Sequence, residues 1–206
     1  MKKILTIFLF ALFVWGIGVN SVAANMAPGE LVESTATKLL DTIKAEKENI
    51  NQDPQRIYQL VDEIVLPHFD FPTMARRVLG KYWKRSTVQQ RKDFTMVFRD
   101  LLVRTYSNSL TEYTDQKITY LPVRESANAK KVVVRSEVEL ASGNPVEVAY
   151  TLANKKERWM VNDIKIDGVS LVTNYRSSFS REIDRNGIES LIAELDAKNK
   201  KGASVE

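Results

Sequence analysis

The sequence predicts an α+β domain: N-terminal helices wrapped against a strongly twisted antiparallel sheet of about four strands, followed by a C-terminal helix. Three observations lead to this fold class. Apolar residues recur at spacings of three and four between residues 28 and 113, as on amphipathic helices. Four runs between residues 118 and 166 read as strands, and short loops between them make their pairing antiparallel. Finally, strand spacing changes to helix spacing at Gly168.

The stretch 159–185 contains that change. Trp159 and Val161, then Ile164 and Ile166, recur at every second residue, as in a strand with one buried face. After Gly168 the spacing is three and four, which predicts a helix with an apolar stripe of Val172, Tyr175, Phe179 and Ile183. The dipeptide Asp167-Gly168 predicts a turn, because glycine adopts positive φ without a side-chain clash. We therefore expect the helix to fold back across the sheet, and the space that it encloses is the candidate site.

The ends of the N-terminal helices are predicted from capping residues and from prolines and glycines that interrupt a helix. Pro28 sets the first helical turn, Asp53-Pro54 begins a second helix that Pro67 ends, and residues 68–72 lead into a third that ends at Gly80. A capping box at 86–89 opens the longest helix, which is expected to reach about residue 113. Its aromatic stripe is expected to lie against the sheet.

The C-terminal half is expected to supply that sheet. Its strands are predicted at 118–123, 132–140, 146–152 and 158–166, with a loop at 141–144. A small helix at 188–195 and a solvated tail at 198–206 complete the chain.

The first 24 residues predict a signal peptide. Lys2-Lys3 precedes an apolar run at 4–19, and small residues up to Ala24 provide a cleavage site, while an uncleaved anchor is the alternative. We expect residues 25–206 to form one exported domain. That part carries 28 Lys and Arg against 26 Asp and Glu, a balance that argues against nucleic acid. Without cysteine, there is no disulfide framework.

The residue types present argue against most kinds of catalytic site. His68 is the only histidine, and the sequence has no cysteine, no GxSxG elbow and no glycine-rich phosphate loop, so no metal or catalytic site is expected. Asp163 and Asp167 offer acid–base chemistry in principle. We expect them instead to flank a turn and hold Arg or Lys neighbours.

Several large apolar residues of the strands and the long helix remain to be explained. Val146, Val148, Tyr150 and Leu152 share one strand face, and the aromatic side of the long helix is expected to meet them. The residues either fill a core or hold two layers apart around a slot. Periodicity does not distinguish these alternatives.

Two stretches resemble one known family. The run 159–171 with residues 174–179, and the earlier Phe69-Asp70-Phe71, Met74-Ala75-Arg76, 78–83 and Phe94, are similar to the MlaC (toluene-tolerance) family of periplasmic phospholipid-binding proteins. The resemblance covers essentially the whole chain after residue 24. It implies an NTF2-like cone with an apolar cavity.

The resemblance also implies a function. A non-enzymatic carrier of this kind takes phospholipid between an outer-membrane lipoprotein–porin complex and an inner-membrane ABC transporter, maintaining outer-membrane lipid asymmetry. Phospholipid is its cargo, and no cofactor is expected. We expect the acyl chains to contact Phe94, Val97, Phe98, Leu101, Tyr106, Val146, Val148, Tyr150, Leu152, Trp159, Val161, Ile164, Val169, Val172, Tyr175 and Phe179.

Candidate head-group residues are Arg176, Lys81 and Arg76. Arg176 lies at the edge of an apolar stripe, and its alternative role is an ion pair with Asp163 or Asp167. Two other classes stay open: a small enzyme with Asp163 or Asp167 as base, and a protein-binding adaptor with a solid core.

Overall fold

The computed structural model describes residues 26–112, 116–123, 129–139 and 144–204. The predicted signal peptide at 1–24 and most of the predicted loop at 141–144 lie outside these ranges. Within them, no helix has both the length and the apolar character needed to cross a bilayer.

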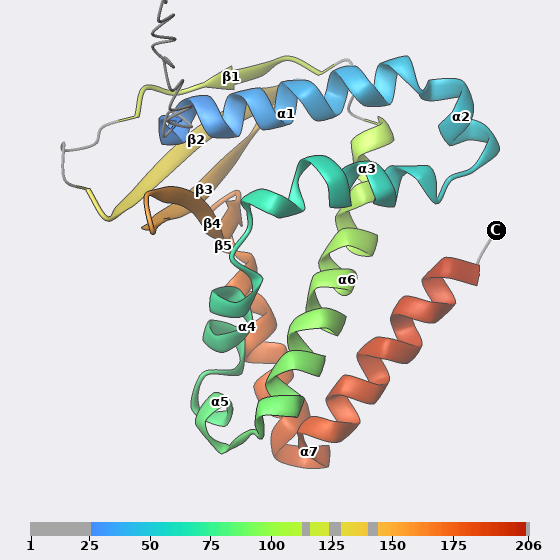
Figure 1. The fold of residues 1–206 in the computed structure, drawn as a ribbon, viewed down its shortest axis with the longest axis vertical. Coiled ribbons are helices and arrows are strands. Elements are labelled where there is room, and N and C mark those ends of the chain that lie inside the picture. Colours follow the sequence, from blue (N-terminus) through green and yellow to red (C-terminus); the bar gives the residue numbers. More distant parts are fainter. Residues whose placement is uncertain (1–25, 113–115, 124–128, 140–143, 205–206) are drawn as a thin grey trace, which may run out of the picture.

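The described chain has a helical N-terminal half, a sheet and a long C-terminal helix, which confirms the α+β prediction (Figure 1). The helical elements of the first half are α1 (Pro28–Ala45), α2 (Lys47–Gln52), α3 (Arg56–Ile64), a 3-10 turn (Leu66–His68), α4 (Phe71–Leu79), α5 (Lys81–Arg85) and α6 (Val88–Glu112). The remaining elements are β1 (Ile118–Tyr120), β2 (Lys131–Glu139), β3 (Pro145–Lys155), β4 (Arg158–Ile166), β5 (Val169–Ser170) and α7 (Leu171–Ser204).

The sheet is an antiparallel meander in the order β1-β2-β3-β4-β5. Its fifth strand, β5, follows the predicted turn directly and pairs back on β4. Asp167 and Gly168 both have positive φ, 48° and 76°, so the expected turn is confirmed. Because this turn is so short, α7 begins at the edge of the sheet.

A β-bulge in β4 sets which side chains face inward. Thr151 pairs with Asp163 while Leu152 pairs with Val161, so Asn162 is the extra residue. The bulge shifts the alternation by one residue. Trp159 and Val161 before it, and Ile164 and Ile166 after it, consequently share one face, which we call the inner face, whereas Asp163 points away from it.

The long helix α6 does not lie on the sheet, and the prediction that it would is wrong. It packs mainly against α7, α4 and α3. Phe94 and Phe98, both fully buried, make ring contacts with Phe179 of α7, and Phe98 also contacts Tyr175 at a centroid distance of 5.4 Å. The reason is that α7 folds back onto the aromatic stripe of α6, while α1 covers the sheet.

The C-terminal helix α7 is longer than predicted and kinked. Gly187, with φ 84° and ψ 168°, interrupts the helical backbone, after which the helix continues to Ser204. The predicted tail is therefore helical from Lys198 to that point. Buried Asn199 explains part of the extension, because its Nδ2 donates a hydrogen bond of 2.9 Å to the Val97 carbonyl on α6.

Polar contacts join β4 to the helices. The Asp70 backbone N–H donates to the Val161 carbonyl at 2.8 Å, and its carboxylate caps α4 by accepting from Thr73 N–H. The same carboxylate, 8% exposed, forms a 2.6 Å ion pair with Lys155. Burial by itself raises the pKa of Asp70, but the bonds from Lys155 and Thr73 outweigh burial and hold that pKa below its usual value.

We predict that Phe98→Ala lowers the free energy of unfolding by about 3–5 kcal/mol, because it removes a fully buried ring from the α6–α7 contact and leaves a cavity. Urea denaturation measures this. The matched control is Met96→Ala on the same helix, where the side chain is 54% exposed and the expected change is within about 0.5 kcal/mol. Similar losses in both variants would show that the α6–α7 core does not dominate stability.

We predict that Asp70→Asn destabilises the fold by roughly 1–2 kcal/mol at pH 7, because Asn keeps the helix cap but loses the ion pair with Lys155. The lowered pKa means that the ionised Asp70 carboxylate is favoured in the folded state. Its contribution is therefore present above the unfolded pKa of about 3.9 and is lost as the pH falls through the lower folded pKa.

Denaturation of both proteins at pH 7 and at pH 3 measures this loss. Exposed Asp41 on α1 supplies the control variant Asp41→Asn, which is expected to change little at either pH. A destabilisation by Asp70→Asn of equal size at both pH values would rule out the ionised carboxylate as its source.

Candidate functional site

Helix α1 covers one half of the inner face of the sheet. Val32 on α1 is buried in a cluster with Val132, Val134, Leu152 and Val161. Strand register explains why these residues meet, since Val132, Leu152 and Val161 are cross-strand neighbours and Val134 lies two residues along the same face. This half of the sheet is an ordinary core.

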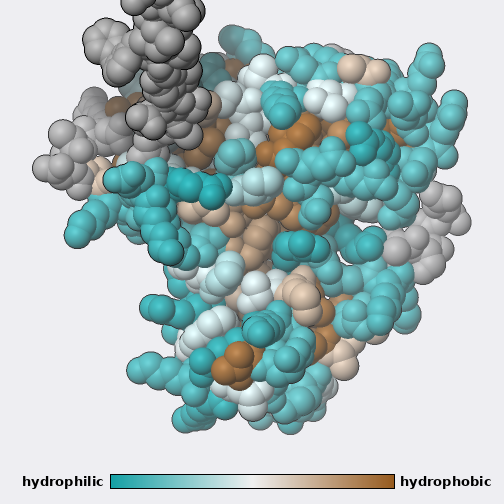
Figure 2. Space-filling model, in the orientation of Figure 1, coloured by the Kyte–Doolittle hydropathy of each residue, from teal (hydrophilic) through white to brown (hydrophobic). Residues whose placement is uncertain are grey.

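The described residues cover the other half of the inner face less completely, although Ser136 within it is fully buried. Ile118, Val138, Val146, Val148 and Ile166 lie there by register, and each is only half-buried. Val169 on β5, at the edge of the sheet, is 58% exposed. Figure 2 shows hydrophobic side chains exposed in separate patches among hydrophilic ones, both at the level of α1 and below it near the centre of the molecule. An apolar strand face thus continues beyond the helix that covers it.

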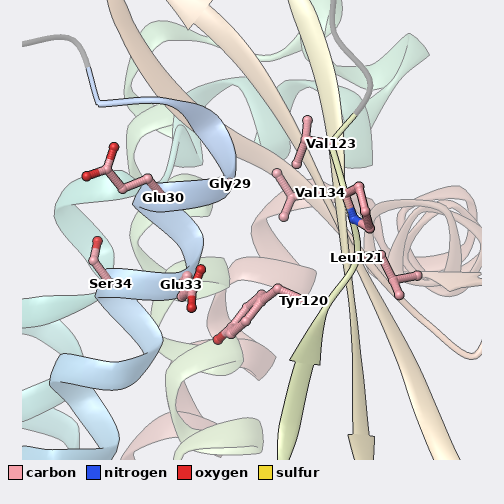
Figure 3. Close-up of a pocket in the computed structure, with 9 residues that line it drawn as sticks. Gly29, Glu30, Glu33, Ser34, Tyr120, Leu121, Val123 and Val134 are labelled. Atoms are coloured by element: carbon pink, nitrogen blue, oxygen red, sulfur yellow. The ribbon is translucent and has the colours of Figure 1, made fainter.

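A cavity of about 450 Å³ opens where the start of α1 meets β1 and β2 (Figure 3). Gly29 permits the close approach of α1 to the segment that follows β1, because a Cβ there would lie 3.1 Å from Cγ2 of Val123. The cavity is lined by Gly29, Glu30, Glu33, Ser34, Tyr120, Leu121, Pro122, Val123 and Val134. Its sheet side is mainly apolar, and its α1 side is acidic.

Two phenols beside this cavity stay uncharged, while the carboxylates of Glu30 and Glu33 line its α1 side. The Tyr120 ring and the Glu33 side chain converge from opposite walls (Figure 3). Burial, together with Tyr150 and Glu33, raises the pKa of Tyr120 to about 12. Burial also raises the pKa of Tyr150, its neighbour on the inner face. Both phenols therefore stay neutral at physiological pH, and the described residues of the lining include no Lys or Arg.

The sixteen residues predicted to contact lipid fall into two separate groups. Phe94, Val97, Phe98, Leu101, Tyr106, Val172, Tyr175 and Phe179 pack together between α6, α7 and α4. The others belong to the sheet: Val146, Val148, Tyr150, Leu152, Trp159, Val161 and Ile164 share the inner face, and Val169 lies on β5. The helical group is mostly occupied with its own core. In the sheet group, Leu152 and Val161 are buried under α1, and less buried members such as Val148 border the remaining surface.

The three predicted head-group cations lie near Gly80, and none lines the cavity. The Arg176 guanidinium packs against Gly80, whose added Cβ would lie 2.9 Å from Nε. Lys81 pairs with Asp184 at 3.6 Å, and Arg76 is exposed on α4. The alternative ion pair of Arg176 with Asp163 or Asp167 is not formed. Asp163 is held by Arg77 instead, at 3.5 Å.

The buried Asp163 carboxylate has a structural role. Its oxygens accept hydrogen bonds from Ser170 Oγ at 2.8 Å and from Val172 N–H at 3.3 Å, which fixes the start of α7. Arg77 also donates to the Asn162 carbonyl and side chain, at 2.8 and 3.0 Å. Across the described ranges, no three His, Cys, Asp or Glu side chains gather as metal ligands.

Sequence reasoning missed the residues contributed by α1, by β1 and by the segment that follows β1. Gly29, Glu33, Tyr120 and Val123 are far apart in the chain, and no local pattern connects them. A partial signal did exist in β2: Val132, Val134 and Val138 occupy even positions while Arg135, Glu137 and Glu139 occupy odd ones, although Val133 is an apolar exception. That alternation indicated an apolar face but not how much of it a helix covers.

Comparison with known proteins gives consistent matches. The family model "MlaC protein" matches residues 33–197. The chain is 28% identical to the intermembrane phospholipid transport system binding protein MlaC of Haemophilus influenzae, over 95% of this chain and 92% of that protein. It is 30% identical to the toluene tolerance protein ttg2D of Pseudomonas putida, over 80% and 76%.

A solved structure agrees with these matches. The phospholipid-binding protein of Ralstonia solanacearum, solved in complex with a phospholipid, superposes with a TM-score of 0.78 at 32% identity, covering 85% of this chain and 98% of that one. The resemblance noted in the sequence is confirmed: this chain belongs to the MlaC family.

Proposed function

We propose that this protein is a non-enzymatic phospholipid carrier that buries acyl chains against the inner face of its sheet, next to α1. The observation that carries the proposal is the half-buried apolar row of Ile118, Val138, Val146, Val148 and Ile166. A β-sheet face that is apolar but uncovered is unfavourable in water unless a ligand completes it. The phospholipid in the Ralstonia relative supports a lipid as that ligand.

The cavity beneath α1 provides the starting space. Its volume, about 450 Å³, lies in the lower part of the range of ligand pockets, roughly 300–1,000 Å³. A two-tailed lipid therefore needs the adjoining uncovered strand face as well. Within the sheet group, we assign the tails to Val146, Val148, Tyr150, Trp159 and Ile164, with Val169 at the edge. Leu152 and Val161, which are buried under α1, and the helical group support this surface.

The head group is expected to remain outside. The acidic side chains Glu30 and Glu33 on the α1 wall oppose entry of a phosphate, and the phenols of Tyr120 and Tyr150 stay uncharged. Arg176, Lys81 and Arg76 are too close to the α4–α5 junction to line this cavity. Selectivity for the head group should accordingly be weak.

Transfer free energies indicate how such a cargo is released. Two sixteen-carbon tails hold about thirty methylenes, each contributing about 0.8 kcal/mol on leaving water, or on the order of 20 kcal/mol in total. A bound lipid does not escape into water on a useful timescale. We infer that the exported protein exchanges lipid in the periplasm by docking on inner- and outer-membrane complexes whose own apolar sites receive the tails.

We predict that organic extraction and mass spectrometry of protein purified from the periplasm recover about one phospholipid per chain. Val148→Trp should lower that occupancy several-fold, because the larger side chain fills the uncovered strand face while its partly exposed position tolerates the added volume. The control is Glu147→Trp, one residue earlier in β3 and facing the other side of the sheet. Circular dichroism checks that both variants fold.

Wild-type protein that is consistently free of lipid would contradict the carrier function itself. Equal occupancy in wild type and Val148→Trp would leave the function standing but remove this strand face as the binding site.

We predict that a labelled phospholipid moves from the loaded protein to membranes containing the partner complexes much faster than to vesicles of phosphatidylcholine alone. Docking offers the tails an apolar site directly, whereas transfer to a bare vesicle requires exposure to water. Fluorescence dequenching follows both rates. Equal rates would show that release does not depend on docking.

A further inference from the structure

The charges of this protein are strongly separated along the chain. Residues 76–92 and 176–189, here named the basic end, contain ten Lys and Arg and three Asp and Glu. The rest of residues 25–206 contains eighteen Lys and Arg and twenty-three Asp and Glu. The net charge of the basic end is thus +7, and that of the rest of residues 25–206 is −5, although the two together are nearly neutral.

The fold brings the two segments of the basic end together. Tyr82 OH on α5 donates to the Ser180 carbonyl on α7 at 3.3 Å, and Lys81 pairs with Asp184. Gln90 of α6 donates a hydrogen bond to Glu189, just beyond the bend of α7. Figure 1 shows α5, the start of α6 and this bend at one extremity, with α1 and the sheet at the other. The positive charges therefore form one surface.

Only part of this charge is neutralised internally. Arg77 is directed to Asp163, and Lys81 to Asp184. The side chains of Arg76, Lys84, Lys92, Arg181 and Arg185 are exposed, and none lies within ion-pair distance of a carboxylate in the described part of the chain. The basic end is available to an external anion.

The composition of this surface favours a membrane over a protein partner. Protein interfaces have an apolar centre from which Lys is depleted. Lys and Arg dominate the basic end, and among its described residues the exposed large apolar side chain is Val88, 66% exposed at the start of α6. Dispersed cations with an isolated apolar side chain match anionic phospholipid head groups, which present charge over a broad area.

We propose that the basic end binds the surface of an anionic phospholipid bilayer. The attraction is electrostatic, and Val88 contacts the interface. Because the uncovered sheet face and α1 lie at the opposite extremity, attachment through the basic end leaves them open to a protein partner. This inference rests on the charge distribution and does not depend on the bound cargo.

The test is co-sedimentation of the full mature protein with vesicles at 10 mM salt. Vesicles of phosphatidylglycerol and phosphatidylcholine, at about three to seven, should bind the protein, while pure phosphatidylcholine should not. Each basic residue near an anionic surface contributes roughly fivefold in partitioning, so Lys84→Glu with Lys92→Glu should weaken binding at least about 25-fold. Binding should also fall steeply in 0.5 M salt, where screening shortens the reach of charges.

Lys131→Glu with Lys165→Glu is the matched control, because both lysines are exposed on the outer face of the sheet and the change in net charge is the same. It should retain most of the binding. Equal loss in the two double variants would overturn the proposal by making net charge alone responsible. No vesicle binding by folded wild-type protein would also overturn it and leave an acidic protein surface as the partner of the basic end.

A failure of this test is distinguishable from a failure of the carrier function. Lipid recovered on extraction with no vesicle binding would refute only the membrane contact. Vesicle binding by protein that contains no extractable lipid would refute only the carrier.

Discussion

One extra residue in β4 is the constraint on which the architecture depends. Asn162 interrupts the pairing between β3 and β4, so β4 keeps four apolar side chains on the inner face and still presents Asp163 to the helices. Asp163 then holds the first turn of α7, and Arg77 ties α4 to the bulge. In an unbroken strand, alternation would place Val161 and Ile164 on opposite faces. The bulge therefore lets one strand serve both the sheet core and the helical layer.

The apolar residues consequently form separate hydrophobic clusters, one between the helices and one on the sheet. Phe94, Phe98 and Phe179 complete a core between helices without help from the sheet. The sheet has α1 as its own cover, and α1 reaches only the half around Val32. What is left over is an apolar surface of the sheet, and the proposed lipid site depends on this surface more than on any polar side chain.

Charge is distributed independently of the apolar surface. Acidic residues of α1 border the cavity, while the basic end is formed by α4, α5, the start of α6 and the bend of α7. The head-group candidates Arg176, Lys81 and Arg76 belong to this second region. Arg176 was predicted to bind a head group because it lies beside the apolar stripe of α7. That stripe faces α6 and not the sheet, so Arg176 lies next to the helical core.

The sequence by itself determined the fold class, the turn at Asp167-Gly168, the strands and the family, because these depend on local spacing, turn chemistry and a continuous motif. The sequence also indicates the bulge, because Val161 and Ile164 are three residues apart in a run whose other apolar residues are two apart. Only the tertiary structure decided which layer each apolar stripe meets. Periodicity reports that a face is buried or bound, but the partner of that face is chosen by contacts between distant segments, such as α7 on α6 and α1 on half of the sheet.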